Sequence, residues 1–234
     1  MPLLHDIKEA LLHLAFPHVC EGCGTDTLQK DHYLCVHCLD ALPTTSFALH
    51  ADNPVEQLFW GRLPIEHAAA FCYFTKESTV QHLVHAFKYR GHQQLGRYLG
   101  RLMGYSLQAS GRFGDIEVLV PLPLHRSRER KRGFNQATIL CEGMAEVLRA
   151  PVLDTCIVRT EHTETQTKKS RVERWENMQG KFRVVDTPAL EGRHVLLVDD
   201  VVTTGATLEA CGQALLQVPG LRLSLATLCT ASGN

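Results

Sequence analysis

One segment near the carboxyl terminus constrains the fold of this 234-residue chain more than any other: residues 195–207, which read VLLVDDVVTTGAT. Its first four residues are all apolar, which is typical of a strand buried on both faces in a parallel sheet. Asp199 and Asp200 follow at the end of that strand, and open α/β sheets bind their ligands at the carboxyl ends of their strands. We therefore expect a ligand site at residues 199–207.

The hydroxyl residues and the glycine after the acidic pair predict a phosphate site. They run into a helical pattern of apolar residues at Leu208, Cys211 and Leu215, and a helix amino terminus presents unpaired N–H groups with partial positive charge. Carboxylates beside such a site suggest a phosphorylated sugar. An ordinary strand–turn–helix with a threonine N-cap is the alternative. It does not explain two adjacent acids, which repel each other unless ligand hydroxyls or a cation compensate their charges.

The segment closely resembles the phosphoribosyl pyrophosphate (PRPP) signature of type I phosphoribosyltransferases. The resemblance implies that Asp199 and Asp200 bind the ribose hydroxyls and act as the catalytic residues, with Mg²⁺ accompanying PRPP. It also implies a 5′-phosphate site formed by Thr203, Thr204, Gly205, Ala206 and Thr207.

Strand and helix patterns alternate along most of the chain, which predicts an α/β fold: a doubly wound, mainly parallel sheet with helices on both faces. Strands are expected at residues 68–74, 117–120, 155–158, 182–185, 195–198 and 222–229. Helices are expected at residues 80–88, 95–107, 136–148 and from residue 208. With the PRPP signature, this pattern implies a type I phosphoribosyltransferase domain at residues 51–234, which begins at a linker around residues 52–54. A small domain at residues 1–50 would hold an amphipathic helix and a four-cysteine zinc knuckle.

Two CxxC pairs eleven residues apart predict a structural zinc site, because four thiolates can close tetrahedrally on one ion. The expected ligands are Cys20, Cys23, Cys35 and Cys38. Nearby alternatives for one ligand are His18, His32 and His37. A redox CxxC, two disulfides and unbound thiols are also open, but zinc is favoured because a redox CxxC needs a larger α/β unit around it. Four cysteine ligands leave no position open for water, so the role would be structural.

A basic run follows the strand expected at residues 117–120 and is expected to form a loop at the same edge of the sheet as the acidic pair. Residues 126–132 read RSRERKR, and their five basic side chains could neutralise a pyrophosphate or a nucleic-acid backbone. A solvated charged turn is the alternative. The polar stretch from Arg159 to Gly180 is expected to be the mobile loop that closes over substrate in type I phosphoribosyltransferases. The expected pyrophosphate contacts are Leu122, Pro123, Arg128, Arg132, Lys168, Lys169 and Arg171.

Three further motifs narrow the resemblance. They are the four-cysteine segment, the run RGFNQ at residues 132–136, and the succession Arg159, Gln166, Arg171, Asn177 and Phe182. In this order, over nearly the whole chain, they resemble the ComF family of ComFC- and GntX-like proteins. The resemblance implies a link to the uptake or processing of DNA during natural transformation.

The overall composition does not favour a general nucleic-acid or membrane binder, because 24 basic residues stand against 25 acidic ones. No apolar run is long enough to cross a bilayer, and the amino-terminal segment lacks the basic region of a signal peptide. Nine cysteines, an odd number, fit a reducing compartment better than a disulfide framework. We expect a cytoplasmic protein.

Two functions are consistent with these motifs. The first is transfer of a phosphoribosyl group from Mg²⁺-bound PRPP to an unidentified acceptor. The second is a non-catalytic module that binds PRPP or a nucleotide and engages single-stranded DNA or a competence partner such as a helicase. Salt-sensitive DNA binding that survives replacement of both Asp199 and Asp200 by asparagine would favour the second function.

Overall fold

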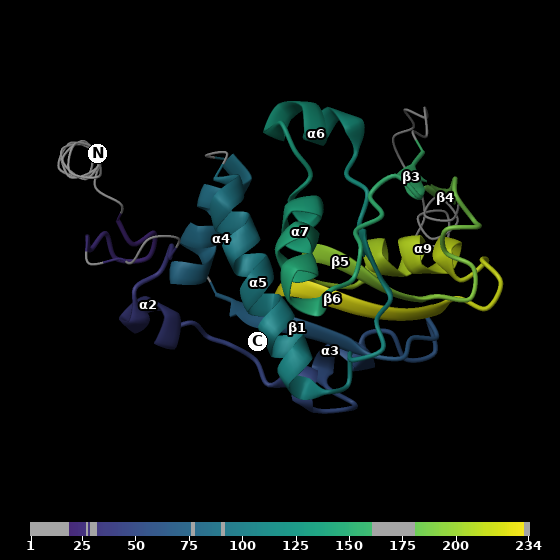
Figure 1. Cartoon of the computed structure of the whole chain (residues 1–234), viewed down its shortest axis with the longest axis horizontal. Coiled ribbons are helices and arrows are strands. Elements are labelled where there is room, and N and C mark those ends of the chain that lie inside the picture. Colours follow the sequence, from purple (N-terminus) through teal and green to yellow (C-terminus); the bar gives the residue numbers. More distant parts are fainter. Residues whose placement is uncertain are drawn as a thin grey trace, which may run out of the picture.

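A four-stranded parallel sheet forms the centre of the protein (Figure 1). The computed structural model describes residues 19–26, 28, 32–75, 78–89, 92–160 and 181–231. The strands lie in the order β1 (Ala68–Phe74), β6 (Arg222–Ala231), β5 (His194–Val202) and β2 (Val118–Pro121). The first five residues of β5 are all buried, as the apolar run predicted. The parallel α/β architecture expected from the sequence is confirmed.

Short segments of the same chain cover both edges of this sheet. Beside β1, the N–H of Tyr73 donates to the carbonyl of Pro43 over 2.9 Å, and the N–H of Thr45 donates to the carbonyl of Phe71 over 2.8 Å. Beside β2, Val152 forms a parallel bridge with Leu119. Covered edges protect a sheet from pairing with other chains.

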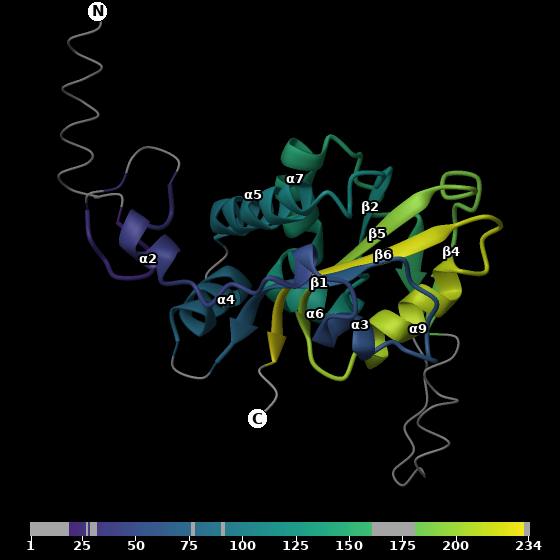
Figure 2. The same cartoon turned by 90° about the horizontal axis from the view of Figure 1, so that it is seen from below.

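Helices lie on both faces of the sheet (Figure 2). One face carries α5 (Gln93–Ser110) and α7 (Gln136–Leu148). The other face carries α3 (Pro54–Gln57) and α9 (Ala206–Leu215). The remaining elements are α2 (Val36–Asp40), a 3₁₀ turn (Phe47–Leu49), α4 (Thr79–Tyr89), α6 (Arg126–Arg132), and the antiparallel pair β3 (Ile157–Arg159) and β4 (Phe182–Val184). Within the described ranges, no helix combines the length and the apolar character that a membrane span requires.

The acidic pair lies inside β5, and the prediction that it follows the strand was wrong. Strand β2 ends with Pro121 opposite Val198, but β5 continues beside β6 as far as the pair Val202–Thr230. The two acids therefore stand on the part of β5 that extends past its neighbour β2. Strand β2 does not extend beside this part of β5, whereas β6 pairs with it on the other side.

Two other expectations also need correction. The basic run is not a loop: it forms α6, which ends at Gly133 in the left-handed conformation. The linker expected at residues 52–54 is a buried N-cap, because Asn53 is 4 % exposed and its side chain accepts hydrogen bonds from two N–H groups of α3. The division of the chain at residue 50 stays a prediction. The amphipathic helix expected before Val19 and the loop at residues 161–180 lie outside the described residues.

Candidate functional site

The connections that follow β2 and β5 leave the carboxyl ends of these neighbouring strands toward opposite faces of the sheet. After β2 the chain passes through α7 to Val152, on the outer side of β2. After β5 it passes through α9, on the opposite face, to β6 on the inner side. Loops that leave neighbouring parallel strands toward opposite faces open a crevice between them, and open α/β sheets bind ligands there. The residues predicted at both strand ends therefore flank one crevice.

The acidic pair stands at this crevice with its side chains half-buried. The Oδ1 atom of Asp199 accepts a hydrogen bond from the N–H of Asp200 over 2.8 Å. On the other side, the N–H of Leu122 donates to the carbonyl of Val198 over 2.8 Å, so Leu122 and Pro123 lie next to the acids. The structure thus brings together the residues that were predicted from two segments more than seventy positions apart in the sequence.

The predicted phosphate loop ends at an uncapped helix. Gly205 occupies the N-cap position of α9 with φ +74°, and no side chain caps the helix there. Thr203 and Thr204 are exposed, and Thr207 is half-buried in the first turn. The alternative of a threonine N-cap is therefore wrong. No side chain caps the first N–H groups of α9, and uncapped N–H groups at a helix start bind phosphate in other helices.

A segment that the sequence did not single out supports this loop. We call residues 58–63, which follow α3, the strap. The ring of buried Phe59 lies against Gly205, and Leu63 lies against Gly212 of α9, where a Cβ atom would come within 2.7 Å of it. The two glycines of α9 make room for the two apolar side chains. This contact could not be read from sequence spacing, because the strap and α9 meet only through the tertiary fold.

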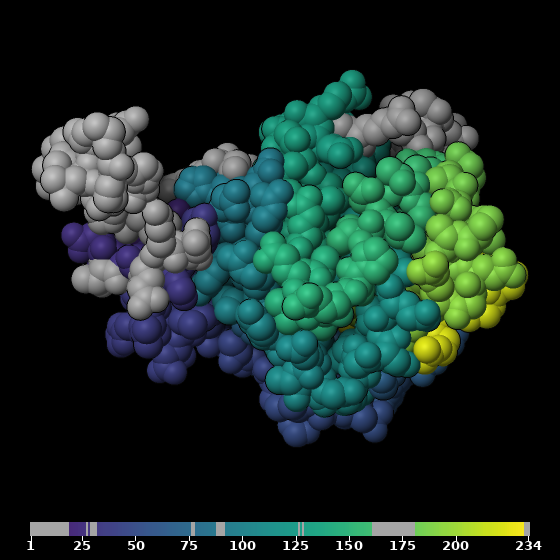
Figure 3. Space-filling model, in the orientation of Figure 1, coloured from purple at the N-terminus to yellow at the C-terminus, as the bar shows by residue number. Residues whose placement is uncertain are grey.

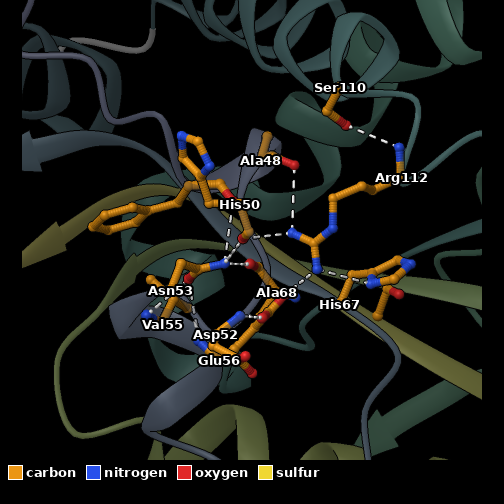
Figure 4. A network of polar contacts seen from close by, with 12 residues as sticks. Ala48, His50, Asp52, Asn53, Val55, Glu56, His67, Ala68, Ser110 and Arg112 are labelled. Atoms are coloured by element: carbon orange, nitrogen blue, oxygen red, sulfur yellow. Dashed lines mark hydrogen bonds and ion pairs between the residues drawn. The ribbon is translucent and has the colours of Figure 1, made fainter.

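A polar network holds α3, and through it the strap (Figure 4). The side-chain amide of Asn53 donates to the carbonyl of Ala68 over 2.8 Å. Glu56, which is 7 % exposed, accepts from Arg112 over 2.7 Å and from the N–H of Ala68 over 3.1 Å. Arg112 also lies 3.1 Å from His67, and burial, followed by the nearby Arg112 charge, lowers the pKa of His67. These contacts fix α3 against the first residue of β1.

The basic helix α6 lies at the same rim and stands out from the body of the protein (Figures 1 and 3). His125 caps its amino terminus, and Arg130 and Lys131 are exposed. The guanidinium of Arg132 donates to Gln136 over 2.6 Å, which ties the end of α6 to the start of α7. Arg128 lies on α6 itself. Lys168, Lys169 and Arg171 lie outside the described residues.

Asn135, which the sequence analysis named only as part of the run RGFNQ, has a structural role at this site. Its side chain caps α7 by accepting from the N–H of Ala137 over 3.1 Å, and its amide donates to the carbonyl of Leu122 over 3.0 Å. It therefore connects the turn after β2 to the start of α7. An Asn directly before a helical pattern is a readable N-cap signal, but its second bond depends on the fold.

A groove of about 480 Å³ lies between β4 and α9, away from the acidic pair. Its walls include Phe182 of β4, Gln213 of α9 and Gln217, which follows the end of α9. None of the described residues among those predicted for PRPP lines this groove, so its volume says nothing about that site.

The four predicted cysteines form one compact cluster. Their sulfur atoms all lie within 4.8 Å of one another, and those of Cys23 and Cys35 are 3.7 Å apart. Four zinc–sulfur bonds of about 2.3 Å in a tetrahedron would place the sulfurs about 3.8 Å apart. All nine cysteines are free thiols, so the disulfide alternative is wrong. The donor set and its spacing fit a thiolate-bound metal such as zinc.

Backbone N–H groups around the cluster favour the thiolate form of Cys20. Burial opposes the charged form of Cys20, but N–H groups of Cys35, Cys23 and Gly22 outweigh it and lower the pKa of Cys20 to about 6. Burial and the neighbouring thiols raise the pKa of Cys38. Four crowded thiolates repel one another without a cation, which explains why the two pKa values move in opposite directions.

The cluster rests on the α/β body. The Nδ1 atom of His92, just before α5, lies 3.0 Å from the carboxylate of Glu21. The rings of Tyr33 and Tyr98 of α5 have centroids 5.7 Å apart. Gly22 lies against Thr79 at the start of α4. A metal in the cluster would thus stabilise a segment that packs on α4 and α5.

Comparisons with known proteins agree with this geometry. A family model described as "Phosphoribosyl transferase domain" matches residues 133–233. The chain is 30% identical over 209 residues to Competence protein F of Haemophilus influenzae, covering 87% of this chain and 86% of that protein. It is 28% identical over 221 residues to the DNA utilization protein YhgH of Escherichia coli, covering 92% of each. Over 151 residues, or 62% of this chain and 56% of that protein, it is 30% identical to Competence protein ComFC of Bacillus subtilis.

Proposed function

The chain belongs to the ComF family of competence and DNA-utilization proteins, and on that premise we propose that it binds PRPP with Mg²⁺ and transfers the phosphoribosyl group to an acceptor. The observation that carries the proposal is the pairing of an uncapped helix amino terminus with two acids on the part of β5 that extends past β2. The first group suits a phosphate and the second suits ribose hydroxyls. PRPP contains both, joined by one sugar ring.

In this proposal the 5′-phosphate lies on residues 203–207. The N–H groups of the first turn of α9 donate to its oxygens, and the exposed hydroxyls of Thr203 and Thr204 add further donors. Gly205 is required because its left-handed backbone lets the chain turn tightly from β5 into α9.

Asp199 and Asp200 would accept hydrogen bonds from the ribose 2′ and 3′ hydroxyls. The pyrophosphate would then lie toward Leu122 and Pro123, with Arg128 and Arg132 of α6 and with Lys168, Lys169 and Arg171 as further contacts. When bound, Mg²⁺ would neutralise part of the pyrophosphate charge and favour its departure. Lysine and arginine side chains at this rim would supply the rest of the compensating charge.

The reaction would be displacement at the anomeric carbon. The bond from that carbon to pyrophosphate breaks as the acceptor, a nucleobase or an amine, forms a new bond to it. Positive charge develops on the sugar in the transition state, and the half-buried carboxylates of Asp199 and Asp200 lie where they can stabilise it. Closure of the crevice against water would keep PRPP from hydrolysis.

The four-cysteine cluster would hold zinc in a structural role. Its ligands Cys20, Cys23, Cys35 and Cys38 fill all four tetrahedral positions, so no position remains for a reacting water. We propose that residues 1–50 form this zinc domain and that residues 51–234 form the phosphoribosyltransferase domain. A cytoplasmic location, where thiols stay reduced, would suit such a site.

Calorimetric titration of the zinc-loaded protein with Mg²⁺ and PRPP tests the proposal. We expect binding by the wild type and loss of most of it in the Asp199→Asn, Asp200→Asn variant. A matched control is the Glu66→Gln, Glu191→Gln variant, which removes two exposed carboxylates near the amino ends of the strands. Absence of binding by the wild type would remove PRPP as the ligand. Equal binding by both double variants would remove the acidic pair from the site.

The second function, contact with single-stranded DNA, is favoured by one observation: α6 projects from the surface and carries exposed Arg130 and Lys131. Phosphate contacts make DNA binding steeply salt-dependent. We expect Arg130→Gln with Lys131→Gln to weaken DNA binding and reduce its salt dependence. Exposed Arg183 and Arg193, replaced by Gln together, provide the control. Equal losses of DNA affinity in the two variants would show that binding depends only on the overall charge of the protein and not on α6.

A further inference from the structure

Arg62 of the strap reaches the phosphate loop and the helix behind it. Its Nη1 atom donates to the carbonyl of Thr204 over 3.2 Å and to the carbonyl of Leu58 over 2.8 Å. Its Nη2 atom forms an ion pair with the carboxylate of Glu209. The side chain of Arg62 is 39 % exposed, and that of Glu209 is only 11 % exposed. One guanidinium therefore connects the strap, the loop and α9.

Glu209 creates an electrostatic problem for the proposed phosphate site. It is the fourth residue of α9, so its carboxylate lies within the first turn of the helix whose amino terminus would hold the phosphate. A carboxylate there is favourable for an empty helix, but it occupies the positive end that a phosphate would also use. Because Glu209 is buried, its repulsion of a bound phosphate is screened less by salt than that of a surface acid.

Arg62 solves this problem by pairing with Glu209. A second effect comes from its bond to Thr204. In a trans peptide the C=O and the following N–H point in opposite directions. The carbonyl of Thr204 points at Arg62, so the N–H of Gly205 points away from the strap, toward the other side of the loop. The same contact therefore compensates charge and orients a donor.

We propose that Arg62 is a positioning residue of the phosphate site, which neutralises Glu209 and sets the direction of the Thr204–Gly205 peptide. The inference rests on the proposed function, since it concerns the same site. It assigns a role to the strap, a segment that lies outside the PRPP signature. Arg62 does not touch the ligand in this arrangement, and it acts through Glu209 and the loop.

The test measures binding of ribose 5-phosphate and of Mg²⁺ with PRPP by calorimetry in four variants: Arg62→Gln, Arg62→Lys, Glu209→Gln and the double variant Arg62→Gln, Glu209→Gln. We expect Arg62→Gln to lower the affinity for both ligands on the order of tenfold, because a charge near a helix terminus has an effect of that size. Glu209→Gln should bind at least as tightly as the wild type. The double variant should recover most of the affinity that Arg62→Gln loses. Arg62→Lys keeps the positive charge and should lose less affinity than Arg62→Gln.

The control is Arg101→Gln, which breaks a more exposed ion pair with Glu146 between α5 and α7 and should leave ligand binding unchanged. Higher salt should reduce the difference in ligand affinity between the wild type and Arg62→Gln. If Arg62 served only as a mechanical brace, Glu209→Gln would weaken binding as much as Arg62→Gln does, and that result would overturn the inference. Should Arg62→Gln fail to fold, the Glu209→Gln result alone still decides.

The two proposals fail in different ways. A wild type that binds neither ligand removes the proposed function and this inference with it. A wild type that binds PRPP, beside an Arg62→Gln variant that binds equally well, leaves the proposed function intact and removes only the role of Arg62.

Discussion

The ring of Phe59 lies where a side chain on Gly205 would be, since a Cβ atom added to Gly205 would come within 2.9 Å of two of its carbon atoms. Phe59 is fully buried, so its ring could move only by displacing other buried groups. Gly205 is thus restricted twice: by its left-handed backbone and by this contact. The shape of the proposed phosphate loop depends on a residue from the other end of the chain.

Gly205→Ala should therefore disturb the site more than backbone strain alone would. The left-handed conformation costs a residue with a side chain about 1–2 kcal/mol, and crowding of a packed contact adds about 1–3 kcal/mol. Gly111→Ala is the control, because Gly111 has φ +70° but nothing within 4 Å of an added Cβ. Urea unfolding and PRPP titration should show a larger loss for Gly205→Ala. Equal losses of stability would mean that the Phe59 contact relaxes without cost.

Arg112→Met should destabilise the protein by about 3 kcal/mol, because it leaves the carboxylate of Glu56 buried without its partner. The matched change Arg101→Met breaks the more exposed pair with Glu146 and should cost less than about 1 kcal/mol. Chemical denaturation of both variants measures the difference. A small effect at Arg112 would mean that water reaches Glu56 and that the network of Figure 4 is not a rigid support for α3.

The stability of the protein should rise with pH through the range below 6.5, the ordinary pKa of histidine, because of His67. Burial and Arg112 lower the pKa of His67 in the folded protein, so the unfolded chain takes up a proton there first as the pH falls. The free energy of unfolding then decreases with falling pH until folded His67 is also protonated. Glu56, Glu66 and His194 act on the same ring. His67→Gln should flatten this part of the profile of unfolding free energy against pH; an unchanged profile would assign the dependence to another group.

Cys23→Ser should lower the metal content well below one ion per chain and lower the unfolding temperature, because one of the four ligands is lost. Cys72→Ser is the control, since Cys72 is a buried thiol of β1 outside the cluster. Elemental analysis and thermal unfolding with and without a chelator provide the measurements. Full metal content in Cys23→Ser would mean that another group, such as a histidine, completes the site.

A chain that begins at residue 51 should be less stable than one that begins at residue 43. The shorter chain loses the carbonyls of Phe47 and His50, which accept from buried Asn53, and the backbone bond between Thr45 and Phe71. A buried amide without its partners costs about 1–3 kcal/mol per lost bond. The unfolding temperatures of the two truncated chains measure this difference in stability. Equal stability would mean that these contacts of residues 43–50 add nothing to the stability of the domain proposed at residues 51–234.

Much of the core fold was readable from hydrophobic patterns. The helix predicted at residues 136–148 coincides with α7, and the strand predicted at residues 68–74 coincides with β1. The run RSRERKR was misread because it has no apolar face, and periodicity of apolar residues is the signal on which such predictions depend. Its helix is set by its ends instead, through the cap at His125 and the turn at Gly133.

The position of the acids relative to the end of β5 could not be predicted, because it depends on where the partner strands stop. Strand β2 ends opposite Val198, whereas β6 accompanies β5 to Val202. A strand's length is fixed by hydrogen bonds to its neighbours, and no local pattern in one strand reports the length of another.

The sequence by itself determined the alternation of strands and helices, the two acids followed by the TTGAT turn, and the two CxxC pairs, because each of these is a local pattern of residue types. Only the tertiary structure decided that Phe59 and Arg62 contact the loop at residues 203–205, that Arg112 holds α3, and that the cysteine cluster rests on α4 and α5. These contacts join segments far apart in the chain. Their energies come from burial and from opposite charges brought together, and neither exists before the sheet and its helices have packed.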